Sequence, residues 1–98
     1  MEYTVGPLYV SPARHVVRVN GRDVTLTLKE YEVLKMLLEN QDVVLTRDRL
    51  LNQVWGYSFD GESRTVDVHI RTLRQKLMEA GELIETVRGV GYKIGVRP

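Results

Sequence analysis

The stretch ESRTVDVHIRTLRQKLMEA, residues 62–80, decides the fold and predicts the third helix of the chain. Its apolar residues recur at helical spacing: Val66, Ile70, Leu73 and Leu77. On a helix these four fall within about 60° of one another and form a stripe for the core. The opposite side carries Arg64, Val68, Arg71 and Gln75, with Thr72 beside them. Two arginines and a valine therefore share the solvent face of this helix.

That face has two interpretations. Arginines on one helix face can reach guanine O6 and N7 or phosphates, and a valine can meet a thymine methyl in the major groove. The alternative is a solvated, charge-rich face that binds nothing. The flanks carry Asp67 and Arg74 on one side, and Thr65, His69 and Lys76 on the other. His69 is expected to be a surface or phosphate-facing residue rather than a metal ligand.

Two shorter helices are predicted before residue 62. Thr27 and Glu30 have capping-box spacing, and a helix of about twelve residues should follow and end near Asn40. Its apolar residues are Leu28, Tyr31, Leu34, Leu37 and Leu38. Thr46 should open the second helix, with Asp48 in its first turn. The apolar side of this helix is Leu50, Leu51, Val54 and Trp55.

Strands are expected at both ends of the chain. Residues 17–19 and 24–26 alternate across Asn20-Gly21, a strong hairpin signal, and short runs around 3–5 and 8–10 precede them. We expect an antiparallel sheet of three or four strands there. Residues 83–87 and 92–95 flank Arg88-Gly89-Val90-Gly91 and predict a second hairpin of undecided register. Arg88 is either a polar turn residue or a side chain for a narrow minor groove.

The segment between the second and third helices, residues 56–61, should be a loop. It contains two aromatic residues, Tyr57 and Phe59, that a plain linker would not need. Trp55, immediately before it, either packs against the core or presents its indole N–H to a phosphate.

Composition limits the function. The 98 residues are enough for one globular domain, with 43% hydrophobic and 28% charged residues. No apolar run approaches a membrane span or a signal peptide, and the absence of cysteine fits a reducing, cytoplasmic location. We expect no membrane association, no metal and no cofactor, since the only histidines, His15 and His69, are far apart.

Catalysis is not expected. Asp67 and His69 lie two positions apart, which places them about 200° apart around a helix, so they cannot form an acid–base pair. No nucleophile elbow, zinc-protease motif or phosphate-binding loop occurs in the sequence.

Charge is distributed unevenly along the chain. Residues 1–62 hold seven Lys/Arg and nine Asp/Glu, whereas residues 63–98 hold seven and four, within an overall net charge of +1. The excess of Lys and Arg over Asp and Glu in the last third favours a basic binding surface there.

Three segments carry a resemblance to a known family: residues 54–56 (VWG), 64–74 (RTVDVHIRTLR) and 86–92 (TVRGVGY). Together with the N-terminal strands and the LTLKEY start of the first helix, they closely resemble the DNA-binding effector domain of OmpR/PhoB-type bacterial response regulators. The resemblance implies an α+β winged helix-turn-helix over residues 1–98, with three helices, an N-terminal antiparallel sheet and a C-terminal β-hairpin wing. Such a domain regulates transcription and is not an enzyme.

The resemblance also implies which residues meet DNA. The third helix would lie in the major groove and the wing, residues 83–95, in the minor groove. Val68 matches a position that meets thymine methyls, Arg88 matches the wing arginine, and the others match phosphate or groove positions. The full set is Trp55, Arg64, Thr65, Val68, His69, Arg71, Thr72, Arg74, Thr86, Arg88 and Tyr92. Thr72 departs from several relatives that carry a base-reading arginine there, so their operator sequence does not transfer.

Partners follow from the same resemblance. Relatives have a receiver domain, which we expect to be absent from residues 1–98, and bind direct repeats of double-stranded DNA head to tail after phosphorylation of the receiver. The isolated domain is expected to be a monomer. The loop that faces RNA polymerase in relatives corresponds to Gly56, Tyr57, Ser58, Phe59, Asp60, Gly61 and Glu62. The rival interpretations are a winged helix that binds only protein and, more remotely, a small hydrolase.

Overall fold

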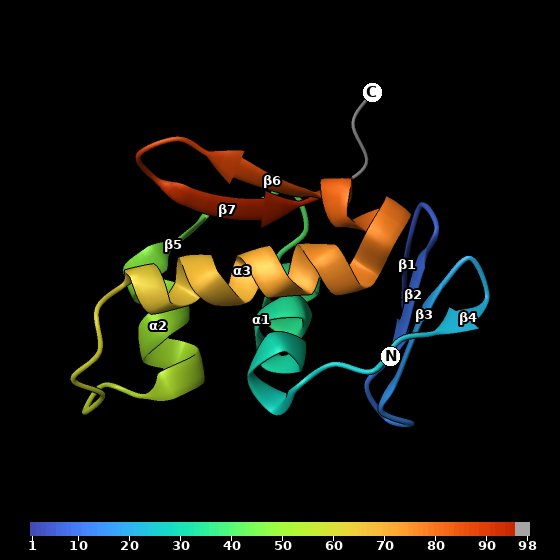
Figure 1. The fold of residues 1–98 in the computed structure, drawn as a ribbon, viewed down its shortest axis with the longest axis horizontal. Coiled ribbons are helices and arrows are strands. Elements are labelled where there is room, and N and C mark those ends of the chain that lie inside the picture. Colours follow the sequence, from blue (N-terminus) through green and yellow to red (C-terminus); the bar gives the residue numbers. More distant parts are fainter. Residues whose placement is uncertain (96–98) are drawn as a thin grey trace.

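The computed structural model describes residues 1–95, and residues 96–98 of the predicted domain lie outside the described residues. Three helices stand between a four-stranded sheet and a three-stranded sheet (Figure 1). In chain order the elements are β1 (Tyr3–Val5), β2 (Leu8–Ser11), β3 (Val16–Val19), β4 (Arg22–Asp23), α1 (Leu28–Glu39), β5 (Leu45–Thr46), α2 (Arg47–Trp55), α3 (Arg64–Leu77), the 3₁₀ helix η1 (Met78–Leu83), β6 (Ile84–Val87) and β7 (Gly91–Ile94).

The N-terminal sheet is antiparallel, with the strand order β1-β2-β3-β4. Asn20 and Gly21 form the predicted hairpin turn, and both have positive φ, as a two-residue hairpin loop requires. The prediction of a strand over residues 24–26 was wrong. Pairing with β3 resumes directly after the turn, with Arg22 opposite Val19. β4 therefore ends at Asp23, and the chain turns away toward the cap of α1.

The capping box of α1 is present as predicted. Thr27 accepts a hydrogen bond from the backbone N–H of Glu30, and the Glu30 carboxylate accepts one from the N–H of Thr27 at 2.8 Å. Leu28, which we placed on the apolar stripe, is instead 61% exposed. It is the first helical residue, and side chains on a helix point back toward its N-terminus, here beyond the packed face.

α3 carries the predicted core stripe, and all four of its apolar residues are buried. The helix is shorter than the predicted 62–80, because Met78 has a φ of +50° and the chain tightens into η1. Gly81 then packs against the carbonyl of Arg74, where an added Cβ would lie 2.5 Å from the oxygen. A further turn of α-helix would prevent that close approach.

The wing is a β-hairpin of β6 and β7, with a register that pairs Thr86 with Tyr92 and Val87 with Gly91. A third strand, which we did not predict, joins it: β5 pairs with β7 through Leu45 and Thr46. Thr46 also caps α2, as predicted, so one residue ends the strand and begins the helix.

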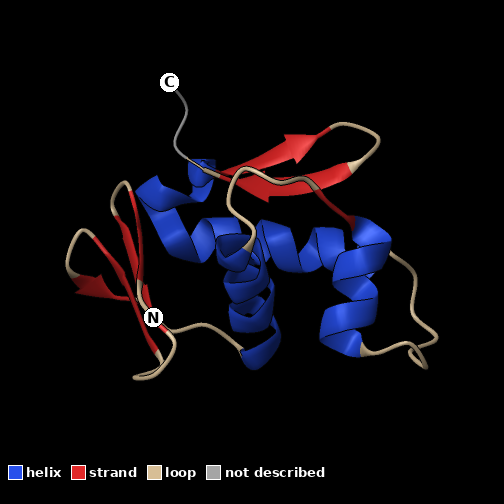
Figure 2. Ribbon diagram, turned by 180° about the vertical axis from the view of Figure 1, so that it is seen from behind, coloured by secondary structure: helices blue, strands red, loops and turns tan. Residues whose placement is uncertain are grey.

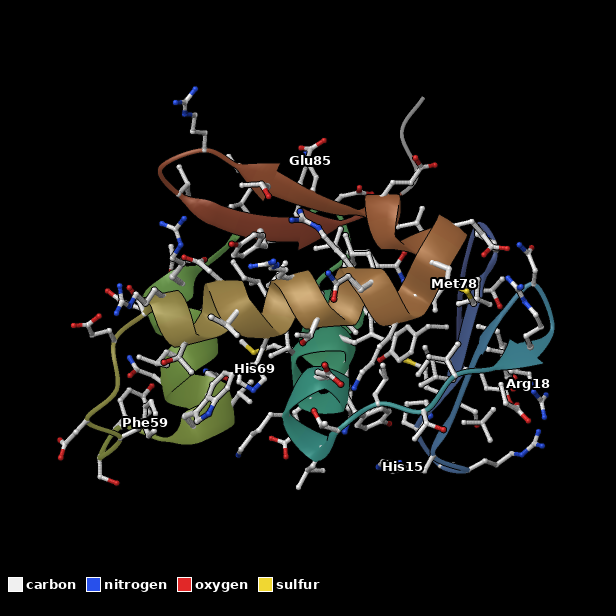
Figure 3. All side chains as sticks on the ribbon, in the orientation of Figure 1. His15, Arg18, Phe59, His69, Met78 and Glu85 are labelled. Atoms are coloured by element: carbon white, nitrogen blue, oxygen red, sulfur yellow. The ribbon has the colours of Figure 1, made fainter. Side chains whose placement is uncertain are left out.

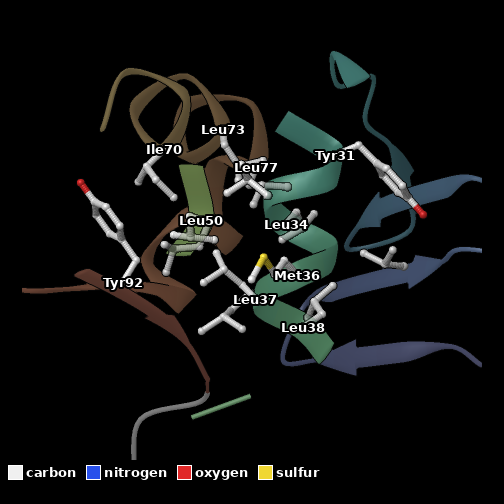
Figure 4. Close-up of a cluster of buried hydrophobic side chains, with 14 of the residues drawn as sticks. Tyr31, Leu34, Met36, Leu37, Leu38, Leu50, Ile70, Leu73, Leu77 and Tyr92 are labelled. Carbon is white, nitrogen blue, oxygen red and sulfur yellow. The ribbon is translucent and has the colours of Figure 1, made fainter. Parts of the chain in front are cut away.

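The hydrophobic core lies around α1, which stands between α3 and the N-terminal sheet (Figures 2 and 4). The helix contributes a buried face that includes Leu34, Leu37 and Leu38. Residues of α2, α3 and the wing close the same cluster on the other side. This single core fixes α3 across the bundle, with its opposite face turned outward.

Candidate nucleic-acid interface

The outward face of α3 is open to solvent as predicted. Arg64, Val68, Arg71 and Gln75 are all exposed, and Val68 is 58% exposed. Arg64 forms an ion pair with Glu62 at 3.1 Å between two well-exposed side chains, which contributes little to stability. The face therefore offers two exposed arginines and an exposed apolar side chain, and the one ion pair on it, between Arg64 and Glu62, is weak.

The tip of the wing is the second exposed basic element. Residues 88–90 form a turn closed by the N–H of Val90, which donates to the carbonyl of Val87 at 2.9 Å. Arg88 and Val90 are both exposed, and Gly89 adopts a positive φ. The wing projects beyond the helical bundle, alongside α3 (Figure 1).

One flank of α3 packs against Trp55 at the end of α2. The rings of Trp55 and His69 meet edge to face, with their centroids 4.8 Å apart. The Nδ1 of His69 hydrogen-bonds the carbonyl of Thr65 at 2.9 Å, and a carbonyl only accepts, so Nδ1 carries the proton. The ammonium of Lys29 lies over the indole ring of Trp55, 5.8 Å from its centre. Both interpretations of Trp55 thus remain compatible with its half-buried position.

The other flank faces the wing and holds a carboxylate. Asp67 accepts hydrogen bonds at the same Oδ1 atom from the Tyr92 hydroxyl and from Nε of Arg47, the latter at 2.7 Å. Burial by itself would raise the pKa of Asp67, but these two donors and the charge of Arg47 outweigh it and lower that pKa. Burial and the bond to Asp67 raise the pKa of Tyr92. The carboxylate stays charged and the phenol stays neutral.

Arg74 is turned toward the wing rather than toward open solvent. Its guanidinium donates to the carbonyl of Ile84 at 2.7 and 3.1 Å and to the hydroxyl of Thr86 at 2.8 Å. The same group lies 5.6 Å from the centre of the Tyr92 ring. Arg74 and Asp67 share a side of the helix as predicted, but each bonds the wing instead of the other.

The predicted DNA-binding residues thus fall into three groups by exposure. The exposed ones are Arg64, Val68, Arg71, Thr86 and Arg88. The half-buried ones are Trp55, Thr65, His69, Thr72 and Arg74. Tyr92 is only 5% exposed. Its hydroxyl and the hydroxyl of Thr72, which donates to the carbonyl of His69, have partners inside the fold.

Sequence reasoning missed two cations at this surface, Arg47 and Lys29. Arg47 bonds Asp67, and Lys29 donates to the carbonyl of Val54 at 2.9 Å beside Trp55. Both occupy the first turn of a helix, where position alone suggests only solvent exposure. Only the packing of α2 and of α1 brings them to the flanks of α3.

The loop at residues 56–62 lies beyond the end of α2, and Figure 3 shows Phe59 on it, away from the N-terminal sheet. Tyr57 is 82% exposed, and the Phe59 ring lies 6.2 Å from the Trp55 ring. The loop contains no helix or strand, as predicted.

The family model described as "Transcriptional regulatory protein, C terminal" matches residues 21–94 of this chain. The chain belongs to this family. Its fold is the winged helix of OmpR/PhoB-type effector domains, as the sequence predicted.

Two relatives illustrate the sequence similarity. Sensory transduction protein RegX3 of Mycolicibacterium smegmatis is 46% identical over 92 residues, which are 91% of this chain and 40% of that protein. Regulatory protein VanRB of Enterococcus faecalis is 43% identical over 93 residues, 95% of this chain and 41% of that protein. The chain therefore spans about two fifths of the length of these relatives.

Solved structures agree with the fold. The Klebsiella pneumoniae RstA DNA-binding domain, in complex with the RstA box, has a TM-score of 0.84 and 34% identity, with 96% of both chains covered. Response regulator DrrB of Thermotoga maritima, an OmpR/PhoB homologue, has a TM-score of 0.88 and 31% identity, covering 97% of this chain and 44% of that one.

Across residues 1–95, no helix is both long enough and apolar enough to cross a membrane. In the same described residues, no three His, Cys, Asp or Glu side chains gather as they would around a metal ion.

We expect Val68 to contribute to sequence reading, because it is an apolar side chain with no role in the core. Val68→Ala should relax the preference at one thymine position by roughly 1 kcal/mol while leaving affinity for mixed DNA nearly unchanged. Selection of bound fragments from a random pool, with wild type and variant in parallel, measures both. An unchanged preferred sequence with uniformly weaker binding would exclude this role.

Proposed function

We propose that this domain binds double-stranded DNA in a sequence-specific manner and regulates transcription as the output domain of a two-component response regulator. The observation that carries the proposal is the pairing of an exposed, arginine-bearing face on α3 with an exposed arginine at the tip of the wing. The family of transcriptional regulators to which the chain belongs supports it, as does the RstA domain solved with its own DNA box.

In this proposal α3 enters the major groove and the wing, residues 83–95, approaches the minor groove. Val68 and Arg71 meet base edges, and Arg64 meets a phosphate, because these side chains project opposite the core stripe. The half-buried residues of the predicted set, such as His69 and Arg74, lie at the edges of the same surface. The protein catalyses no reaction in this role, and its site of action is the bacterial cytoplasm.

Salt dependence tests the proposal directly. A fluorescence titration with a labelled mixed-sequence duplex at 50 and 200 mM salt should give binding that weakens steeply, because neutralised phosphates release counterions. Absence of binding at low salt would favour the rival interpretation, a winged helix that binds only protein.

Arg88 carries a separate prediction. If its guanidinium enters the minor groove, Arg88→Ala should cost roughly 1–3 kcal/mol on a site with an A·T-rich flank and less on a G·C-rich flank, because the narrow A·T groove has the stronger negative potential. Anisotropy titrations with the two duplexes measure the difference. Equal losses would make Arg88 a phosphate contact, and no loss would mean that the wing does not dock.

The oligomeric state can be predicted from where the apolar faces of the three helices are buried. Buried residues of all three helices belong to one core, so none of the three stripes is left for a dimer seam. The free chain should be a monomer that neutralises about three to five phosphates, with a salt slope near −3 to −4. Two copies should load side by side on direct repeats about one helical turn apart. Sedimentation and footprinting would contradict this if they gave a stable free dimer or a preference for inverted repeats.

Two protein partners complete the proposal. A phosphorylated receiver dimer would tether two copies and raise apparent affinity through effective concentration, with no change within this domain. The loop 56–62 is the proposed contact with RNA polymerase, since it presents the exposed ring of Tyr57 on a segment that the DNA-facing surface does not use.

A further inference from the structure

We infer that Asp67 is a positioning residue that joins the wing to α3, so that the two DNA-contacting parts meet the duplex as one rigid body. This inference rests on the proposed function and adds to it a link that fixes the wing relative to α3. Asp67 lies on α3, the helix that we place in the major groove. A free carboxylate on this helix would repel the phosphates of the DNA.

The geometry brings three elements to one oxygen atom. Oδ1 of Asp67, on α3, accepts from the hydroxyl of Tyr92 on β7 and from Nε of Arg47 on α2. Hydrogen bonds to a charged group are stronger than those between neutral groups. The charge of Asp67 is thus directed to the wing and α2 instead of to the DNA.

The ring of Tyr92 on β7 also lies near Arg74, which bonds β6, the other strand of the wing. The guanidinium groups of Arg47 and Arg74 lie 6.0 and 5.6 Å from the centre of this ring. Arg74 also bonds the carbonyl of Ile84 and the hydroxyl of Thr86 on β6. Side chains of α3 therefore hold β7 through Asp67 and β6 through Arg74.

The link matters because the backbone pairing of the wing with β5 is short. β7 is paired with β5 over only two residue pairs, Leu45 with Tyr92 and Thr46 with Gly91. Beyond Gly91, residues 88–90 are exposed. Without the bond from Tyr92 to Asp67, the angle between the wing tip and α3 would depend on this short ladder, on the buried Ile84 and Ile94 and on the bonds of Arg74 to β6.

The free protein provides the first test, through amide hydrogen exchange of wild type, Tyr92→Phe and a control. Tyr92→Phe removes only the hydroxyl and should speed exchange of the β6 and β7 amides about tenfold, with α1 and α3 amides unchanged. Tyr9→Phe is the matched control, because Tyr9 donates to Glu2 at 2.8 Å on the N-terminal sheet and should change nothing in the wing. Equal acceleration throughout the protein would overturn the inference, because it would reflect lost stability alone.

The second test is a double-mutant cycle on DNA with an A·T-rich flank. Tyr92→Phe should weaken binding about 3- to 10-fold in the wild-type background, but less than about twofold once Arg88→Ala has removed the wing contact. Effects that multiply would overturn the inference, because Tyr92 would then contact DNA independently of the wing. If the wild-type chain bound no DNA, the proposed function would fail, whereas hydrogen exchange would still decide the role of Asp67.

Discussion

Glu30→Ala should destabilise the domain by about 2–4 kcal/mol, an effect large enough to threaten folding. Glu30 is 2% exposed, and its Oε1 accepts from the N–H of Thr27 and from Nζ of Lys76 at 2.7 Å. Removing the carboxylate deletes the bond that satisfies the N–H of Thr27, although the Thr27 side-chain cap stays, and leaves the ammonium of Lys76 without its partner between α1 and α3. Urea unfolding followed by circular dichroism measures the loss.

Glu32→Ala is the matched control, because Glu32 is on the same helix and has no ion pair among the described residues. It should change the free energy of unfolding by less than about 0.5 kcal/mol. Similar losses for the two variants would contradict a special role of Glu30.

The same carboxylate should make stability depend on pH. Burial opposes ionisation of Glu30, but the hydrogen bonds from Lys76 and from the backbone N–H of Thr27 outweigh it and lower the pKa of Glu30 from 4.5 to about 2. A group whose pKa is depressed by folding stabilises the protein above its unfolded pKa and loses that contribution as the pH falls toward its folded pKa. Stability should therefore drop by about 3 kcal/mol between pH 4.5 and 2, and Glu30→Gln should remove this part of the dependence.

Arg71→Glu should weaken binding to a selected site about 100-fold or more, because it removes a groove contact and places a negative charge among phosphates. The side chain is exposed on the outward face of α3 and is not needed for the core. Anisotropy titration at fixed salt measures the affinity, and the melting temperature should stay close to that of the wild type.

Arg14→Glu makes the same change in net charge at an exposed turn residue between β2 and β3. This turn belongs to the N-terminal sheet, and Figure 3 shows the neighbouring His15 at the end of that sheet, away from the wing. Its effect on affinity should stay within about threefold. Equal losses for Arg14→Glu and Arg71→Glu would mean that only overall charge attracts the DNA.

Local sequence signals predicted much of this fold because their causes are local. The capping box of α1, the Asn20-Gly21 turn and the core stripe of α3 each depend on residues a few positions apart. β5 had no such signal, because its two residues are a strand only where β7 lies beside them. The end of α3 was missed for the same reason, since the close approach of Gly81 to Arg74 exists only in the folded chain.

The candidate site divides in the same way. Helical periodicity predicted the exposure of Val68 and Arg71, because the core stripe fixes the opposite face. The partners of Arg74, Tyr92 and Arg47 depend on where the wing and α2 pack against α3. Helical periodicity says nothing about how separate elements pack. Resemblance to a family marked Arg74 and Tyr92 as interface residues, whereas the structure gives their polar groups partners inside the protein.

An NMR titration of the labelled chain with a duplex selected from a random pool tests the central claim most directly. Amide resonances on the exposed side of α3, around residues 64–75, and in the wing around Arg88 should shift, whereas those of the N-terminal sheet, residues 3–23, should not. Shifts confined to the N-terminal sheet, or no shifts at low salt, would contradict DNA binding through α3 and the wing.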